Sequence, residues 1–337
     1  MLLATLSIIL GFVLLIKGAD WLVDGATVIS RRLGVSDLVI GLTVVSFGTS
    51  APELIVNLIA SFQGSSDIAI GNIVGSNISN TLLILGITAI VAPLVVQRST
   101  VLKEIPLNLL AAFMLFVLAN DFLMNGYAIS ELSRSDGIVF LGFFIIFIYY
   151  TFGIRHDGVQ EDLNQDKKVT KPTRPLWIAY LLVVIGCAGL ALGGKLAVDG
   201  AISIAKLLHI SEALVGLTIV AVGTSLPELA ASVVAAHKGK ADIAVGNIVG
   251  SNIFNIFWIL GLSSIIKPLT FTPATNLDLY VVLLSTLLLF FIIHNGAPHR
   301  RLLMWWSQSK DYIIRRWEGG VLLGSYFIYI AYIVWRG

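Results

Sequence analysis

The fold is decided by the stretch GLTVVSFGTSAPELIVNLIASFQGSSDIAIGNIVGSNISNTLLILG, residues 41–86. This run is apolar enough to lie in a bilayer, yet it carries Glu53 directly after a proline. The same text returns 175 residues later, at 216–261, without an insertion or deletion, and 27 of the 46 positions are identical. A duplicated apolar segment that holds a proline and a carboxylate predicts a membrane chain built from two related halves.

The composition is that of a membrane protein. Of the 337 residues, 57% are hydrophobic and 12% are charged, which is about half the charged fraction of a typical soluble domain. Apolar runs follow one another along the chain and are long enough to cross a hydrocarbon core about 30 Å thick. They do not alternate as the strands of a transmembrane barrel do. We therefore expect an all-α polytopic membrane protein.

Ten transmembrane helices are predicted, arranged as two inverted five-helix repeats. The first repeat takes residues 1–153, a cytoplasmic linker takes 154–175, and the second repeat takes 176–337. Because five is odd, the second repeat enters the membrane upside down, an arrangement typical of secondary transporters. The predicted spans are roughly 2–30, 35–62, 67–93, 101–120, 136–153, 176–205, 211–236, 241–266, 277–294 and 318–335.

The distribution of basic residues predicts how the chain lies in the membrane. In this ten-span arrangement, 16 of the 22 lysines and arginines fall on one side. That side is expected to be cytoplasmic, so both termini lie outside the cytoplasm. Residues 296–317 are basic and aromatic and are interpreted as an interfacial segment, with a helix on the membrane surface. The N-terminal run continues past Trp21 and is interpreted as a true first span of a protein in the cytoplasmic membrane.

The motif that contains the acid occurs as GTSAPE at 48–53 and as GTSLPE at 223–228. Its proline has no N–H, so the carbonyl of Gly48 or Gly223 loses its helical partner. At membrane depth, a freed carbonyl is tolerated only where protein or a cavity satisfies it, and a cation is one such partner. A proline kink closed by neighbouring hydroxyls is the structural alternative, and the kink alone does not decide between the two.

The two glutamates favour the cation. A carboxylate near the middle of a span costs several kcal/mol, and no lysine or arginine falls in the middle of these spans. Two carboxylates balance one divalent ion, and Ca²⁺ takes about six to eight oxygen ligands. Neither histidine nor cysteine is near, which argues against zinc or copper. Two neutral carboxyls that link helices by hydrogen bonds are the alternative. The candidate ligands are Glu53, Glu228, the Ser50 and Ser225 hydroxyls, and the carbonyls near Thr49 and Thr224.

A second motif follows in both halves, GNIVGSNISN at 71–80 and GNIVGSNIFN at 246–255. Its glycines suit close helix packing, and its polar residues recur every four positions on one face. For Asn72 and Asn77, a role in helix packing and a functional role are both left open. For Ser76 and Asn80 we favour a role in binding the cation or in supporting its ligands. The counterparts of these two residues are Ser251 and Asn255.

The paired motifs in a duplicated chain resemble those of the sodium/calcium exchanger family of the cation/calcium antiporter superfamily, in its prokaryotic form without a regulatory domain. The resemblance implies that Glu53 and Glu228 bind Ca²⁺ and Na⁺ in alternation, and that the long first and sixth helices slide. It further implies carbonyl and hydroxyl ligands from Thr49, Ser50, Thr224 and Ser225, sodium ligands from Ser76 and Ser251, and backbone oxygen from Ser46 and Ala221. Asn80 and Asn255 depart from relatives that carry an aspartate at one of these positions.

The expected function is Na⁺/Ca²⁺ antiport by alternating access, not an enzymatic reaction. No nucleophile–base pair accompanies the glutamates, and we expect no cofactor and no nucleic acid. The expected partners are the two transported ions and the lipid bilayer, and an oligomer is not required. A proton-coupled Ca²⁺ antiporter is the nearest alternative, although its members typically resemble GNxxE where this chain has GTSxPE. A cation channel with a two-carboxylate filter is a third possibility, but nothing in the sequence supplies a continuous polar pore.

Overall fold

The computed structural model describes residues 2–97, 100–126, 129–153, 175–207, 221–294 and 312–336. These residues are mostly helical, which confirms the predicted fold class. Eight of the helices in these ranges are long and apolar enough to cross a membrane, and the bent pair Asp37–Thr49 and Ala51–Gln63 would make a ninth. The predicted span 211–236 lies partly outside the described residues, so the count of ten stays a prediction.

The elements of the first half begin with the longest helix. They are α1 (Leu2–Leu33), α2 (Asp37–Ile40), η1 (Gly41–Val45), α3 (Ser46–Thr49), α4 (Ala51–Gln63), α5 (Ser66–Ile78), η2 (Ser79–Ile84), α6 (Leu85–Val91), β1 (Leu94–Val96), η3 (Thr100–Glu104), α7 (Ile105–Leu118), α8 (Asp121–Asn125), β2 (Ser130–Leu132) and α9 (Arg134–Gly153). The segments η1, η2 and η3 are π-helical and continue directly into the α-helices that follow them.

The second half repeats much of this order. Its elements are α11 (Leu176–Leu207), α13 (Ala221–Gly223), α14 (Leu226–His237), α15 (Ala241–Ile253), η6 (Phe254–Leu260), α16 (Gly261–Ile266), β3 (Leu269–Phe271), η7 (Pro273–Thr275), α17 (Asn276–His294), β4 (Tyr312–Ile314) and α18 (Arg316–Arg336). The segment η6 is π-helical, like η2, and η7 is a single 3₁₀ turn.

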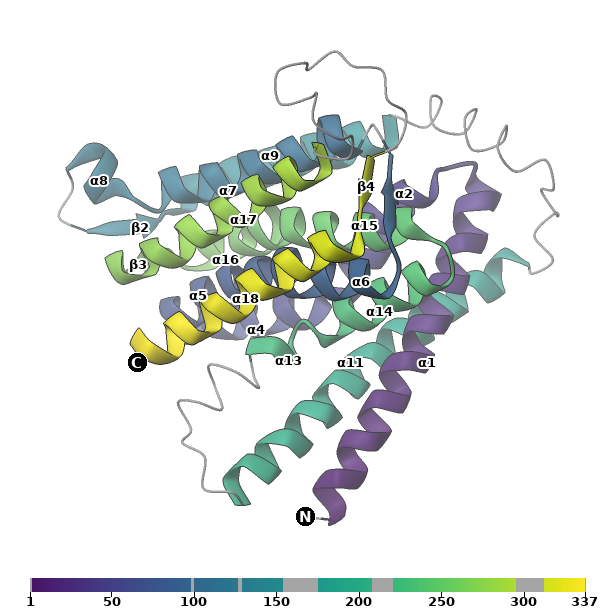
Figure 1. The fold of residues 1–337 in the computed structure, drawn as a ribbon. Helices are drawn as coiled ribbons and strands as arrows, with labels where there is room; N and C mark the ends of the chain where they lie inside the picture. Colours follow the sequence, from purple (N-terminus) through teal and green to yellow (C-terminus); the bar gives the residue numbers. More distant parts are fainter. Residues whose placement is uncertain are drawn as a thin grey trace.

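The helices α1 and α11 lie antiparallel, side by side, and project away from the remaining helices (Figure 1). Each is 32 residues long. Glycines line their contact: a Cβ added at Gly18 would lie 2.8 Å from the Leu190 nitrogen, and one at Gly193 would lie 2.8 Å from the Leu15 nitrogen. Small residues allow this close backbone approach. The sequence therefore builds the long pair as one closely packed unit.

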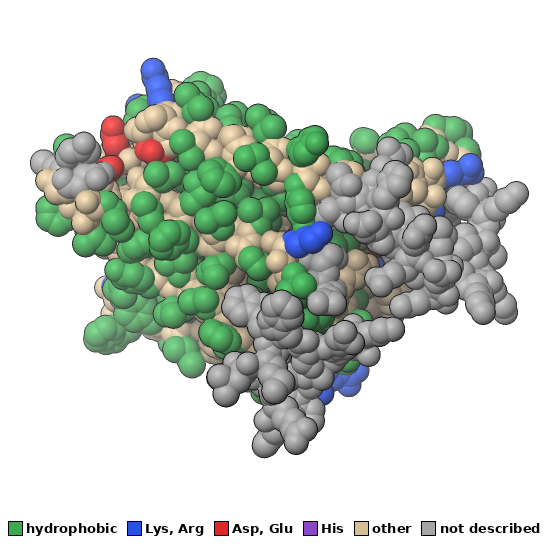
Figure 2. Space-filling view, turned by 90° about the horizontal axis from the view of Figure 1, so that it is seen from above, with side chains coloured by type: hydrophobic (Ala, Val, Ile, Leu, Met, Phe, Trp, Pro, Cys, Tyr) green, Lys and Arg blue, Asp and Glu red, His purple; other side chains and the backbone are tan. Residues whose placement is uncertain are grey.

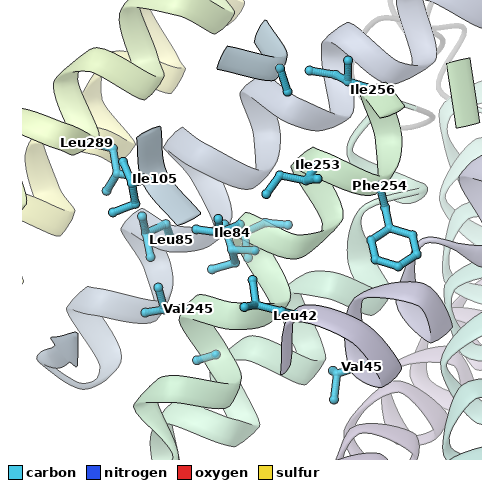
Figure 3. Close-up of a cluster of buried hydrophobic side chains, with 14 of the residues drawn as sticks. Leu42, Val45, Ile84, Leu85, Ile105, Val245, Ile253, Phe254, Ile256 and Leu289 are labelled. Atoms are coloured by element: carbon cyan, nitrogen blue, oxygen red, sulfur yellow. The ribbon is translucent and has the colours of Figure 1, made fainter. Parts of the chain in front are cut away.

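The centre of the molecule is formed by the duplicated segments. In the spans Ser66–Val91 and Ala241–Ile266, 83% and 94% of the most apolar 18-residue windows are buried. Figure 3 shows Ile84 and Leu85 of the first half in one apolar cluster with Ile253 of the second. The other helices therefore surround these two spans.

Each half is covered by the last helix of the other. Helix α18 packs on α6 where Gly319 meets Gly86, and α9 packs on α16 where Gly137 meets Gly261. Gly86 and Gly261 hold the same position in the duplicated text. The short strands also join the two halves, because β1 pairs antiparallel with β4 and β2 pairs antiparallel with β3. The contacts between the halves are thus reciprocal.

The expected interfacial segment 296–317 is only partly visible, since residues 295–311 lie outside the described ranges. Its visible end, Tyr312–Ile314, is a β-strand and not part of a surface helix. Pairing with β1 explains the difference, because the partner strand lies far away in the sequence.

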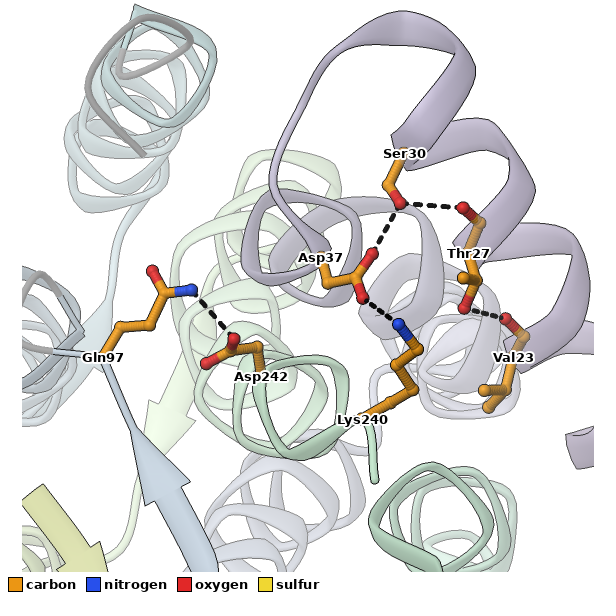
Figure 4. A network of polar contacts seen from close by, with 7 residues as sticks. All are labelled: Val23, Thr27, Ser30, Asp37, Gln97, Lys240 and Asp242. Atoms are coloured by element: carbon orange, nitrogen blue, oxygen red, sulfur yellow. Dashed lines mark hydrogen bonds and ion pairs between the residues drawn. The ribbon is translucent and has the colours of Figure 1, made fainter. Parts of the chain in front are cut away.

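Charged residues gather at one end of the bundle. Lys240 Nζ lies 2.9 Å from Asp37, which also accepts a hydrogen bond from the Ser30 hydroxyl at 2.6 Å (Figure 4). In the same region, Gln97 donates to Asp242 at 2.8 Å. These contacts tie the turn between α14 and α15 to elements of the first half.

The outer surface is apolar. Figure 2 shows hydrophobic side chains spread over the visible face, with few charged side chains among them. Large examples include Ile59, Ile145 and Phe327, each more than half exposed. Such a surface suits lipid, and the chain is a multi-pass membrane protein.

Candidate cation site

Both halves contain a broken helix at the GTSxPE motif. In the first half, α3 ends at Thr49, Ser50 takes φ −82° and ψ 7°, and α4 leaves at an angle of 49°. In the second half, Ser225 takes nearly the same conformation, φ −89° and ψ 4°, before α14. A proline lies in the first turn of each new helix, where its missing N–H does no harm. The predicted break is therefore present in both halves.

Glu53 and Glu228 are placed by these breaks. Each lies in the first turn of the helix that follows, and each side chain is only 1% exposed. The N-terminus of a helix favours a nearby negative charge, so the fold holds two buried carboxylates without an ion pair to either among the described residues. The Glu228 carboxylate lies beside the first broken helix, because it accepts a hydrogen bond from Ser50 at 2.9 Å.

One carboxylate oxygen of each glutamate accepts a hydrogen bond, and the other has no partner in the described part of the chain. The Ser76 hydroxyl donates to Glu53 Oε1 at 3.4 Å, and the Ser50 hydroxyl donates to Glu228 Oε1 at 2.9 Å. The Oε2 atoms of both glutamates have no hydrogen-bond partner within the described part of the chain. Because Ser50 and Glu228 belong to different halves, neither half completes the site alone.

Four asparagines join the halves beside the glutamates. Asn80 Nδ2 donates to Asn252 Oδ1 at 3.1 Å, and Asn255 Nδ2 donates to Asn77 Oδ1 at 2.9 Å. The two bonds are reciprocal, since each runs from the last residue of one motif to the opposite motif. Their donors are occupied, while Asn80 Oδ1 and Asn255 Oδ1 have no partner among the described residues.

The two amides that end the motifs lie in π-helical turns. Asn80 is the second residue of η2, and Asn255 is the second residue of η6. π-Helical turns occur mostly as short insertions and often at functional sites. Their presence at the same place in both halves indicates that local backbone geometry helps to place these amides.

The remaining predicted residues differ in their surroundings. Thr49 is buried, and its hydroxyl lies 3.0 Å from Asn247 Oδ1 and 3.3 Å from the Ser46 carbonyl. That carbonyl also accepts the Ser50 N–H at 2.9 Å, so the local helix already uses it. Thr224 is half-buried, and Ala221 begins α13, where its side chain lies outside the description.

Several buried oxygen atoms of the two duplicated motifs have no partner in the described residues. An unsatisfied buried polar atom is expensive, so their concentration here points to a ligand. Carboxylate, amide and hydroxyl oxygens are the donors that hard cations such as Ca²⁺ take. Within the described ranges, no three histidine, cysteine, aspartate or glutamate side chains lie close enough together to hold a metal ion by themselves. The unpaired atoms are Glu53 Oε2, Glu228 Oε2, Asn80 Oδ1, Asn255 Oδ1, Ser225 Oγ and Ser251 Oγ.

Sequence reasoning left the role of Asn77 open and gave none to Asn252. Both hold the amides at the ends of the motifs, a role visible only after the halves are brought together. Asn72 has a packing role, because its amide donates to Asn57 at 2.7 Å and to the Glu53 carbonyl at 3.4 Å. Asn247 makes the matching contact with the Glu228 carbonyl at 3.4 Å.

Comparison with known proteins gives consistent matches over the whole chain. The family model described as sodium/calcium exchanger protein matches residues 3–153 and 178–335. A putative antiporter, CaxA, from Alkalimonas amylolytica is 41% identical over 289 residues, covering 85% of this chain and 88% of the relative. The sodium/calcium exchanger MaX1 from Methanosarcina acetivorans is 34% identical, covering 98% of this chain and 97% of the relative.

A solved structure agrees with the sequence matches. A structure of the sodium-calcium exchanger NCX_Mj, soaked with zero Na⁺ and Ca²⁺, superposes with a TM-score of 0.78 at 34% identity. The match covers 98% of this chain and 99% of the other. The two chains therefore share the same fold over nearly their whole length.

Proposed function

Because this chain belongs to the sodium/calcium exchanger protein family, we propose that it exchanges Na⁺ for Ca²⁺ across the cytoplasmic membrane by alternating access. The family makes the chain a cation/Ca²⁺ antiporter and not an enzyme. The proposal adds sodium as the coupling ion, and the shared site of Glu53 and Glu228 as the place where the two ions compete.

The observation that carries the proposal is the pair of buried glutamates supplied by opposite halves. Each keeps one oxygen without a partner among the described residues, and unpaired amide and hydroxyl oxygens accompany them. Two formal negative charges balance one Ca²⁺ or two Na⁺. A third Na⁺ would leave one positive charge on the loaded site, so a three-for-one exchange would move charge across the membrane.

The arrangement of the helices supports alternating access. In α1 and α11, only 22% of the most apolar window is buried, whereas the spans that carry the asparagines are almost wholly buried. Glycines of the motif face the long pair, because a side chain at Gly48 would collide with Cys187 and one at Gly223 with Val198 of α11. A shift of α11 would therefore act directly on both broken helices.

Sodium is favoured over protons by the motif and by the relatives. The names of MaX1 and NCX_Mj both describe exchange of sodium for calcium. Two neighbouring buried carboxylates are also suited to protonation, so proton coupling is the second candidate. The basic residues on one side of the predicted spans support a cytoplasmic location for that side, with both termini outside.

The test is a flux experiment in proteoliposomes with the pH clamped on both sides. An imposed outward Na⁺ gradient is expected to drive uptake of radioactive Ca²⁺, and Glu53→Gln or Glu228→Gln is expected to abolish it. Ser61→Ala provides a control in α4, because the Ser61 hydroxyl only donates to the Asn57 carbonyl of its own helix. Uptake that ignores the Na⁺ gradient but follows a pH gradient would replace sodium by protons in the proposal.

A further inference from the structure

We infer that the chain holds a second cation site, for one monovalent alkali-metal ion, around Glu104 and apart from the paired glutamates. Glu104 is the last residue of η3 and is fully buried, at 0% exposure. Neither of its carboxylate oxygens has a hydrogen-bond partner among the described residues. An unpaired carboxylate inside a membrane span is expensive and marks a functional site until a partner is found.

Other polar groups around Glu104 are unpaired as well. Thr100 and Asn108 lie four residues before and after it, on the same side of the helix, and are 0% and 1% exposed. Thr100 Oγ1 and Asn108 Nδ2 have no partner in the described ranges. The amide of Asn108 can turn to present its oxygen instead. These side chains give a carboxylate, a hydroxyl and an amide along one helix face.

A fourth side chain comes from another helix. The hydroxyl of Tyr150 of α9 faces the Glu104 carboxylate closely enough to interact with it, but the two groups do not reach hydrogen-bond geometry, and the hydroxyl has no other partner among the described residues. The adjacent Lys103 is exposed and makes no ion pair with Glu104 in the described residues. Its Nζ lies 5.5 Å from the centre of the Tyr150 ring, in a cation–π contact. The charge of Glu104 is therefore not neutralised by a direct contact with this lysine.

A proline also lies near Glu104, two residues after it, but η3 continues into α7 without the break seen at Ser50. Pro106 has no N–H, so the carbonyl of Leu102 lacks its usual α-helical donor. The turn that contains this carbonyl is π-helical, Thr100–Glu104.

The second half shows that the fold does not need these polar groups. The residues that correspond to Glu104 and Asn108 at the 175-residue offset are Leu279 and Leu283. Leu279 is buried, at 1% exposure, so an apolar side chain satisfies the packing at this position. The second half has a buried acid one position earlier, Asp278, but this carboxylate is paired with Tyr329 and Arg336, whereas the oxygens of Glu104 have no hydrogen-bond partner among the described residues. One carboxylate with neutral oxygens balances one monovalent ion, which gives the charge of the proposed ligand.

The site lies near the end of the bundle that carries the Lys240–Asp37 contact. Gln97 is three residues before Thr100 and donates to Asp242 at the start of α15. An ion bound at Glu104 would therefore come from the side of the membrane that carries most of the lysines and arginines, which is the predicted cytoplasmic side.

The experiment separates this site from the transport site by disabling the latter. In purified Glu53→Gln/Glu228→Gln protein, thermal unfolding is followed while NaCl or KCl replaces N-methyl-D-glucamine chloride at constant ionic strength. The Tm is expected to rise to a plateau with one of the two salts, because a ligand that binds the folded state stabilises it. Adding Glu104→Gln is expected to abolish the rise.

Two further variants keep the result interpretable. Glu104→Leu/Asn108→Leu copies the second half, so it is expected to fold and to lose the response to salt. Glu318→Gln changes another buried glutamate, whose Oε2 accepts the Arg315 N–H at 2.7 Å, and is expected to keep the response. A Tm that ignores both salts overturns the inference, as does a rise that survives Glu104→Gln. A Tm raised by acid alone, with no effect of either salt, would make Glu104 a proton site.

Discussion

The hydroxyl of Ser50 donates to Glu228 Oε1 at 2.9 Å, so a residue of the first half holds the carboxylate of the second. The corresponding hydroxyl, Ser225 Oγ, has no partner among the described residues. The two halves therefore share one sequence motif but use its serine differently. This asymmetry orients one glutamate more firmly than the other.

Replacing Ser50 by alanine is expected to weaken Ca²⁺ binding. A hydrogen bond to a charged group contributes about 1.5–3 kcal/mol, so the KM for Ca²⁺ is expected to rise by about tenfold or more. Radioactive Ca²⁺ uptake at a fixed Na⁺ gradient measures this change. Ser61→Ala, which removes a buried serine hydroxyl elsewhere in α4, is the control. Equal KM values for the two variants would contradict the role of Ser50.

The hydrogen bonds between the asparagines of the two halves predict that removing one of them lowers both the thermal stability and the affinity for Ca²⁺. Asn252→Ala removes the acceptor of Asn80 Nδ2 and the donor to Thr81 Oγ1, which lies 2.9 Å from Asn252 Nδ2. Each buried group left unpaired costs about 1–3 kcal/mol, so a lower Tm is expected. Since Asn80 also loses its orientation, the KM for Ca²⁺ is expected to rise.

The control for this variant is another amide pair. Asn276 Nδ2 donates to Asn120 Oδ1 at 2.8 Å, away from the site. Asn276→Ala is expected to lower the Tm without changing the KM. If Asn252→Ala also lowers only the Tm, the four asparagines serve packing alone.

Much of the site could be predicted from the sequence because the duplication marks it. Pro52 and Pro227 predict the broken helices. The absence of basic residues in the middle of the central spans predicts that Glu53 and Glu228 have no ion-pair partner there. Local chemistry decides each of these features. The hydroxyls of Ser50 and Ser76, predicted to bind the cation or to support its ligands, contact the two carboxylates in the structure, and their role in binding stays a prediction.

The features that escaped prediction depend on contacts between the halves. The partner of Asn77 is Asn255, far along the chain, and no spacing within one motif reveals it. The strand at Tyr312–Ile314 likewise exists because β1 lies beside it. Glu104 was passed over because it lies outside the duplicated text. An acid two residues before a proline, at the start of an apolar run, was nevertheless a signal present in the sequence.

Close packing of α1 and α11 predicts that larger side chains at their contact will stop transport. A Cβ at Gly18 would lie 2.8 Å from the Leu190 backbone nitrogen, so Gly18→Val must push the helices apart. Overpacking of this kind costs about 1–3 kcal/mol, and we expect uptake to fall at least about tenfold. Uptake is normalised to folded protein by gel filtration. Gly142→Ala, where an added Cβ meets no atom within 4 Å, is expected to leave uptake unchanged, and a similar loss in both variants would refute the explanation.

The ion pairs of Lys238 and Lys240 predict a bias between the two directions of access. Lys238 Nζ lies 2.8 Å from Asp24 and 3.1 Å from Asp20 of α1, and Lys240 Nζ lies 2.9 Å from Asp37. The corresponding residues of the first half are Gln63 and Ser65, which carry no charge. Among the described residues, the turn from α4 to α5 makes no matching ion pair with α11.

Breaking the ion pairs of Lys238 and Lys240 is expected to favour opening on their own side of the membrane. The partners are partly exposed, so the pairs together contribute only about 1 kcal/mol. Lys238→Gln/Lys240→Gln should then lower the apparent KM for Ca²⁺ from that side by up to about fivefold, because more molecules start in the competent state. Vesicles of both orientations distinguish the sides, and about 1 M choline chloride should erase the difference by screening. Glu131→Gln, which changes an exposed side chain of β2, is the control and should have no such effect. A change in KM that persists in high salt would show that the ion pairs are not its cause.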